Sequence, residues 1–198
     1  RPQVQRHIHA MVRDRADAEE LTQDTYARAL ERTEAAFWSF CDDYVELVKT
    51  RGYTEGPDAA SARTALRRAL SALQRLLAPH IPFATEEVWS WWQDGSIHAS
   101  SWPTRSGLLD GTSTVSEHDV HLDAVCAVLA VIRRTKTEAK VSQRAEVAHV
   151  SVSATKVQID CIERSIDDLR NAGAIANIEF RVHDDAVIAA SVRLAESA

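Results

Sequence analysis

The sequence has few of the residues that interrupt or cross-link a chain. It contains six glycines, five prolines and three cysteines among 198 residues. So few glycines and prolines favour long helices, because these two residues end or bend helices most often. The cysteines, Cys41, Cys126 and Cys161, are odd in number and lie among apolar residues. This excludes a disulfide framework, and we expect buried thiols in a reduced, cytoplasmic protein.

Other signals are missing as well. No run of about eighteen apolar residues occurs, so we expect no membrane span. The start, Arg1-Pro2-Gln3, is polar and unlike a signal peptide. It does not begin with methionine, and we expect the chain to be a piece of a longer protein. No glycine-rich phosphate loop, serine elbow or metal-ligand spacing occurs, and His118 and His121 have no further ligand nearby. We therefore predict no catalytic residue, no metal and no cofactor in this chain.

The composition that remains is that of a globular protein. Hydrophobic residues make up 45% and charged residues 26% of the chain. The 23 basic and 29 acidic residues give a net charge of −6. That acidity argues against general polyanion binding, but it leaves room for a local basic face.

Helical patterns dominate the first part of the sequence. Residues 14–50 contain neither proline nor glycine, Asp14 or Asp17 suits an N-cap, and Arg51-Gly52 is a stop signal. Further elements are predicted in this order: a helix at 62–78 capped by Ser61, a helix at 83–92 after Pro82, a short strand at 96–100 and a linker at 103–116.

The last part of the sequence alternates between helix and strand patterns. We predict a helix at 117–138, a strand at 147–152, a helix at 155–170 with its C-cap at 171–173, and strands at 175–182 and 186–194. The fold predicted is mainly α, a helical bundle over 1–102, then the linker at 103–116 and a small α/β subdomain over 117–198.

Positive charge is concentrated in two segments. Residues 61–80 hold four arginines and no acidic residue, and residues 131–144 hold five basic residues against Glu138 alone. Lys49 and Arg51 extend this set. One interpretation is a surface that binds phosphates. The alternative is a set of solvated helix faces whose charges pair with nearby acids.

Four stretches carry a resemblance to one family. They are ERTEAAFWSFCDDYVELVKTRGY (31–53), SARTALRRALSALQRLLAPHIPFATEEVWSWWQDGSIHASSWP (61–103), VIRRTKTEAKVSQRAEV (131–147) and LRNAGAIANIEF (169–180). In this order they resemble the C-terminal half of valyl-tRNA synthetase, over about residues 25–198. The resemblance implies the class I synthetase type of anticodon-binding bundle and a valine-specific tRNA as partner.

The chain departs from that family in what it lacks. Signatures of the nucleotide-binding catalytic domain, the editing domain and the C-terminal coiled-coil arm do not occur. The role implied is recognition, with ATP binding and valine–tRNA ligase activity left to a parent enzyme; whether a catalytic domain lies upstream of this chain is open. Charge placement predicts the contacts with tRNA phosphates, namely Lys49, Arg51, Arg63, Arg67, Arg68, Arg133, Arg134 and Lys136. Polar and aromatic residues of the bundle would meet unstacked loop bases.

A second resemblance covers the start. RPQVQRHIHAMVRDRADAEELTQDTYARAL, residues 1–30, is similar to region 2 of extracytoplasmic-function sigma factors. It implies RNA polymerase as a partner, although the helices that read promoter DNA do not follow. A fused gene and a chance similarity of a polar helix are both open. The alternative function is accordingly a protein-interaction module that keeps the fold.

Overall fold

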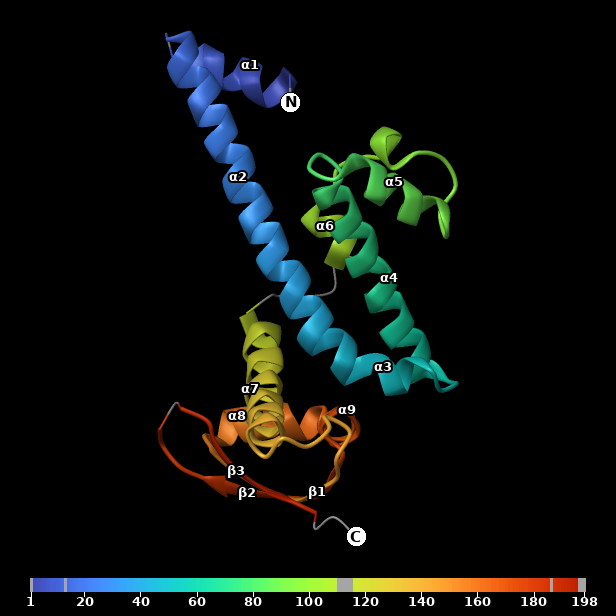
Figure 1. Ribbon diagram of the computed structural model, residues 1–198, viewed down its shortest axis with the longest axis vertical. Coiled ribbons are helices and arrows are strands. Elements are labelled where there is room, and N and C mark those ends of the chain that lie inside the picture. Colours follow the sequence, from blue (N-terminus) through green and yellow to red (C-terminus); the bar gives the residue numbers. More distant parts are fainter. Residues whose placement is uncertain (1, 13, 110–115, 186, 196–198) are drawn as a thin grey trace. The chain divides into compact units, whose positions relative to one another are not determined.

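The computed structural model describes residues 2–12, 14–109, 116–185 and 187–195 (Figure 1). The chain divides into two compact units. Unit 1 comprises Arg1–Phe40 and Arg67–Leu108, and unit 2 comprises Cys41–Leu66 and Leu109–Ala198. Residues 41–66 thus group with the C-terminal elements, whereas the sequence boundaries place them in the 1–102 bundle. Within the described residues, no helix is both long and apolar enough to cross a membrane.

Unit 1 is built from helices. Its elements are α1 (Pro2–Met11), α2 (Arg15–Ser39), the second part of α4 (Pro57–Leu77), α5 (Pro82–Ser90), the 3-10 helix η2 (Ile97–Ala99) and α6 (Arg105–Leu109). Of the two predicted cap candidates, Asp14 and Asp17, the structure has Asp14, whose carboxylate accepts hydrogen bonds from the backbone N–H groups of Ala16 and Asp17 at 2.7 and 3.4 Å.

Three details predicted for residues 57–116 are wrong. Helix α4 begins at Pro57 and not after Ser61, because proline is well tolerated in the first turn of a helix. The strand predicted at 96–100 is η2, whose Ile97 is buried with Trp89. The predicted linker contains α6, and residues 110–115 lie outside the described part.

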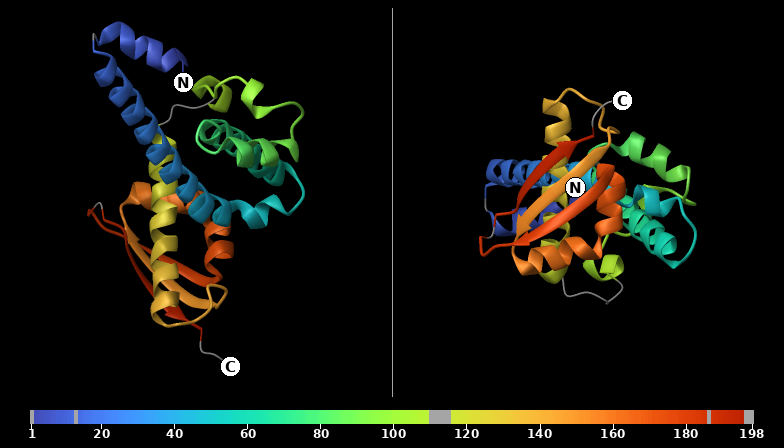
Figure 2. Two further views of the ribbon diagram at one scale, coloured as in Figure 1. Left: turned by 45° about the horizontal axis from the view of Figure 1, so that its top comes forward. Right: turned by 90° about the horizontal axis from the view of Figure 1, so that it is seen from below.

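Unit 2 combines helices with a sheet. Its elements are most of the π-helix η1 (Phe40–Val45), α3 (Glu46–Gly52), the first part of α4, α7 (Ser116–Glu138), β1 (Val147–Ala154), α8 (Lys156–Arg164), α9 (Ile166–Gly173), β2 (Ile175–Val182) and β3 (Ala189–Leu194). The strand order is β2-β1-β3, with β1 parallel to β2 and antiparallel to β3. Helices α7, α8 and α9 cover one face of this sheet (Figure 2). The predicted mainly α fold with a small α/β part is confirmed.

The core of unit 2 lies between the sheet and these helices. Val150 and Val152 of β1 are fully buried, as are Val128 and Ile132 of α7. The alternating burial along β1 is the pattern of a strand with one face on a core. This core fixes the end of α7, which carries several of the predicted tRNA contacts.

The 155–170 segment is two helices and not one. Thr155 and Gln158 form a capping box at the start of α8. At Ser165 the backbone leaves the helical conformation, so α8 ends there and α9 begins at Ile166. The left-handed residue after α9 is Ala174, at φ 52°, and not Gly173. Glycine at 173 is required by packing instead, because a Cβ there would lie 2.8 Å from Ile175 Cγ1. Strand 175–182 has the predicted bounds, whereas β3 begins at Ala189.

Candidate nucleic-acid interface

A hollow of about 680 Å³ in unit 2 contains three of the predicted basic residues. Its walls come from η1, α3, the end of α7, the following loop and the end of α9. We call it the basic groove and define it by its polar lining residues Lys49, Arg133, Gln143, Arg144 and Asn171. Asp42 and Glu46 lie in the same wall, so the groove has mixed charge.

Arg133 is anchored at the floor of the groove. Its Nη1 donates to Asp43 Oδ1 at 3.1 Å, and its Nη2 donates to the carbonyl of Asp42. Both acceptors belong to η1, a π-helix, and such segments are frequent at functional sites. The Arg133 side chain is 31% exposed, so these contacts cover it only in part.

Lys49 and Arg134 make only exposed ion pairs. Lys49 pairs with Glu46 one turn earlier, and Arg134 Nε lies 2.8 Å from Glu138 Oε1. Pairs at such exposed positions contribute little free energy, because solvent screens them. Either cation can therefore exchange its carboxylate for a phosphate at small cost.

Lys136 does not suit the phosphate contact predicted for it. The residue is only 1% exposed, and its Nζ donates to the carbonyls of Gln143 and Gly173 at 3.0 and 2.8 Å. Burial lowers the pKa of this ammonium. We therefore remove Lys136 from the set of direct RNA contacts.

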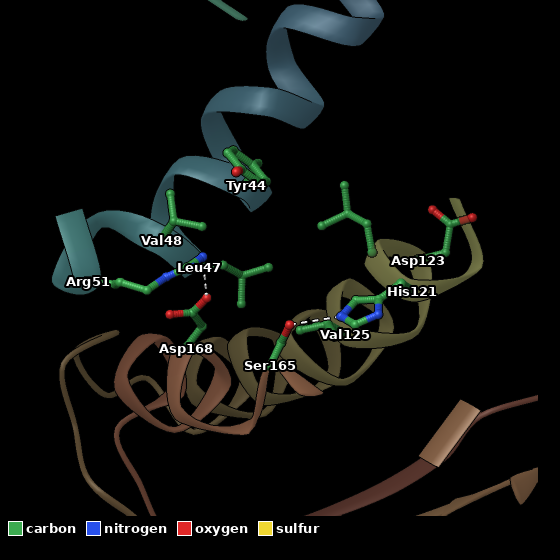
Figure 3. A pocket seen from close by; sticks show the side chains of 10 residues that line it. Tyr44, Leu47, Val48, Arg51, His121, Asp123, Val125, Ser165 and Asp168 are labelled. Carbon is green, nitrogen blue, oxygen red and sulfur yellow. Dashed lines mark hydrogen bonds and ion pairs between the residues drawn. The ribbon is translucent and has the colours of Figure 1, made fainter. Parts of the chain in front are cut away.

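Arg51 lies in a second hollow of unit 2, about 710 Å³ in volume, which we call the Arg51 pocket (Figure 3). Arg51 Nη2 is 2.9 Å from Asp168 Oδ2, and His121 Nε2 is 2.9 Å from Ser165 Oγ. Leu47 belongs to the apolar part of the lining.

The electrostatics of the Arg51 pocket do not favour a phosphate. Burial raises the pKa of Asp168, although Arg51 acts to lower it, and burial likewise raises the pKa of Tyr44. The one guanidinium is thus already paired with a carboxylate. Because the Arg51 guanidinium is paired with Asp168, it is not available for the phosphate contact predicted for it.

Arg63 holds the turn after α3. Its Nε donates to the carbonyl of Gly52 at 2.8 Å and its Nη2 to that of Thr54 at 2.6 Å. Tyr53 lies between these two acceptors in the sequence, and the residue is 90% exposed. Arg63 therefore fixes the backbone that presents Tyr53, an aromatic ring with a free face.

Arg67 and Arg68 belong to unit 1, whereas the basic groove belongs to unit 2. Arg67 is exposed and makes no hydrogen bond or ion pair with any described residue. Arg68 is half-buried and has a partner. Of the eight predicted contacts, the structure brings Lys49 and Arg133 together at the surface of one groove, with Lys136 beneath them.

Sequence reasoning missed four residues of this region, namely Tyr53, Gln143, Arg144 and Asn171. Arg144 was inside the second basic segment, so charge alone offered a signal for it. Nothing local to the sequence indicates that Asn171, after α9 begins, shares a groove with Lys49.

The comparisons with known proteins agree with one another. The family model described as "Anticodon-binding domain of tRNA ligase" matches residues 18–152. The chain is 47% identical over 175 residues to a valine–tRNA ligase of Thermobifida fusca (strain YX), which covers 86% of this chain and 19% of the relative.

Two further relatives show the same pattern. A valine–tRNA ligase of Salinispora arenicola (strain CNS-205) is 44% identical over 173 residues, covering 80% of this chain and 20% of the relative. A valine–tRNA ligase of Leifsonia xyli subsp. xyli (strain CTCB07) is 43% identical over 167 residues, covering 83% of this chain and 19% of the relative. The chain spans about a fifth of the length of these curated relatives. It belongs to the family of anticodon-binding domains of tRNA ligases.

Proposed function

We propose that this chain binds the anticodon stem-loop of a valine tRNA, as a module of the valine–tRNA ligase type. The observation that carries the proposal is the family match over residues 18–152, together with valine–tRNA ligases 43–47% identical to most of the chain. The basic groove supports it, because it gathers cations in a chain whose net charge is −6.

The proposed contacts divide into phosphate and base contacts. Lys49, Arg134 and Arg144 of unit 2 are exposed and hold phosphates of the stem, and so, in unit 1, does the exposed Arg67. Arg133 and Arg68 are half-buried and already have protein partners, so each adds its positive charge beside these contacts. Arg51 and Arg63 act indirectly, since each is engaged with protein atoms. Tyr53 offers a ring on which an unstacked loop base can stack, the common mode of specific RNA recognition.

We assign recognition to this chain and ligase activity to the longer protein. The relatives are named as ligases, and this chain corresponds to about a fifth of their length. In the whole protein the module would hold the anticodon end of the tRNA while a catalytic domain acts elsewhere on the same tRNA.

The test is binding of the full chain to a valine tRNA transcript and to a non-cognate tRNA at two salt concentrations. We expect tighter binding of the valine tRNA than of the non-cognate tRNA. We also expect affinity to fall with salt, with each phosphate contact adding roughly 0.7–0.9 to the magnitude of the slope of log K against log salt concentration. Arg67→Glu should weaken binding and reduce the slope, while Arg164→Glu, at an exposed position of α8 outside the groove, should keep the fold and have less effect. No binding even at low salt would refute the proposal.

The similarity of residues 1–30 to a sigma factor supports a second candidate, an RNA polymerase-binding module. The family match begins at Ala18 and leaves residues 1–17 unassigned. A pull-down with RNA polymerase separates the two candidates. Failure to retain the clamp-bearing subunit would discard the polymerase-binding version.

A further inference from the structure

The loop between α7 and β1 places a positive charge on the rim of the basic groove. This basic loop, residues 139–146, contains Lys140 and Arg144, both exposed. The Arg144 guanidinium makes no hydrogen bond or ion pair with a described residue. Its position therefore depends on how the backbone around it is held.

That backbone is held from within by Lys136. The Lys136 Nζ reaches the carbonyl of Gln143, the residue before Arg144, and also the carbonyl of Gly173 at the end of α9. One buried ammonium thus ties the basic loop to α9. The end of α9 suits a cation, because the last carbonyls of a helix carry partial negative charge.

Two further contacts fix the same loop. The Gln143 side chain donates to the carbonyl of Arg133 at 3.3 Å and to Thr137 Oγ1 at 3.0 Å. The Val141 N–H donates to the carbonyl of Lys136 at 3.0 Å, which closes the end of α7. Gln143 is therefore held through its backbone by Lys136 and through its side chain by α7.

We infer that Lys136 is a positioning residue for RNA binding, which acts by holding Arg144 on the rim of the basic groove. The inference rests on the proposed function. Lys136 is 1% exposed and cannot reach a phosphate itself. If the Lys136 ammonium is removed, the carbonyl of Gln143 loses its donor and the basic loop is no longer tied to α9. Arg144 is then no longer held beside Arg133.

The test is a double-mutant cycle with Lys136→Met and Arg144→Gln, measured as affinity of the full chain for the valine tRNA. Each single variant should lose affinity at 0.1 M salt and lower the magnitude of the log–log salt slope by roughly 0.7–0.9, the change expected for one phosphate contact. The double variant should bind no more weakly than Arg144→Gln alone. Additive losses, or full affinity in Lys136→Met, would overturn the inference.

A second readout needs no RNA. Trypsin cleaves after lysine and arginine, and the basic loop offers Lys140 and Arg144. We expect faster cleavage at these two bonds in Lys136→Met than in the wild type, and cleavage restored to the slower rate in Lys136→Arg, which keeps a donor. Unchanged cleavage in Lys136→Met would overturn the inference.

The control variant is Thr155→Ala, which removes the cap of α8 and lowers stability at a site away from the groove. It should leave both tRNA affinity and cleavage at the basic loop unchanged. If Lys136→Met fails to fold, Lys136→Gln takes its place in the cycle. A wild type that binds no tRNA refutes the proposed function, whereas additive losses in a wild type that does bind refute only the role of Lys136.

Discussion

The two units bury their helices to different degrees. In unit 2 one continuous cluster joins α7, the sheet, α8 and α9, and the long helix α7 buries Val125, Val128, Leu129 and Ile132 in it. In unit 1 the 25-residue α2 buries only Ala18 and Thr33. Tertiary packing therefore stabilises the helices of unit 2, whereas α2 depends more on its cap and on its own backbone hydrogen bonds.

The largest expected effect tests this difference with matched substitutions. Leu129 is 1% exposed in α7, and Leu21 is 46% exposed in α2. Leu129→Ala should cost about 2–5 kcal/mol of the free energy of unfolding. Leu21→Ala should stay within about 0.5 kcal/mol, as for other surface positions. Urea denaturation measures both, and equal losses would break the comparison.

The alkylation rates of cysteine thiols provide a second comparison of burial in the two units. All three cysteines lie in unit 2, and burial, with Asp43 and Asp123, raises the pKa of the Cys126 thiol to about 11. At pH 8 its thiolate fraction is then roughly a hundredfold below that of an ordinary cysteine. We expect alkylation of Cys126 to be correspondingly slow and to rise about tenfold per pH unit between pH 7 and 9.

The matched thiol for this experiment is Ala27→Cys, at an exposed position of α2. Mass spectrometry of tryptic peptides gives both rates in one sample. The introduced thiol should react at the rate of a free cysteine. Of the three thiols expected to be buried, Cys161 is buried whereas Cys41 and Cys126 are partly buried. A Cys126 that reacts as fast as this control would show that the packing of unit 2 does not shield this thiol.

Helix caps give an intermediate effect that should appear differently in the two units. Asp14 caps α2 and Thr155 caps α8. Each replacement by alanine should cost about 1 kcal/mol of helix stability. In Thr155→Ala the loss should lower the midpoint of unfolding of unit 2, whereas in Asp14→Ala it should appear as fraying of α2.

Hydrogen exchange distinguishes these results. We expect Asp14→Ala to speed exchange in the first turns of α2 only, with the amides of β1 unchanged. Faster exchange of β1 in that variant would mean that the caps of both units report on one cooperative structure.

The smallest effect is expected at exposed ion pairs, where packing does not matter. Arg15–Glu19 in α2 and Arg134–Glu138 in α7 are both four residues apart and exposed. Glu19→Gln and Glu138→Gln should each cause only a small loss of stability, because both pairs are exposed and have the basic residue first, and this loss should shrink at high salt. Thermal unfolding at two salt concentrations measures this, and a clearly larger loss in α7 would show that Glu138 has a further role.

Elements could be predicted from the sequence where the spacing of apolar residues matches the buried face of a helix or strand. Strand 175–182 has its predicted bounds, and residue type narrows the cap of α2 to Asp14 or Asp17, of which the structure has Asp14. The start of α4 was missed because Gly56-Pro57-Asp58 looks like a turn, although proline also suits a first helical turn.

The site was harder to predict than the fold. Lys136 follows Ile132 by four residues, so helical spacing places it on the buried stripe of α7. Its charge suggested a surface contact instead, and its acceptors at Gln143 and Gly173 follow only from the tertiary fold. Residue type therefore found the basic segments, whereas pairing and burial decided which of their cations are free.

The most direct test of the proposed function exchanges only the anticodon. The full chain is titrated with a valine tRNA and with the same tRNA carrying a non-cognate anticodon, at one fixed salt concentration. The tRNA body and its phosphates are then nearly constant, so that a difference in Kd reports on the loop bases. We predict weaker binding of the exchanged tRNA. Equal Kd values would contradict recognition of the anticodon by this chain.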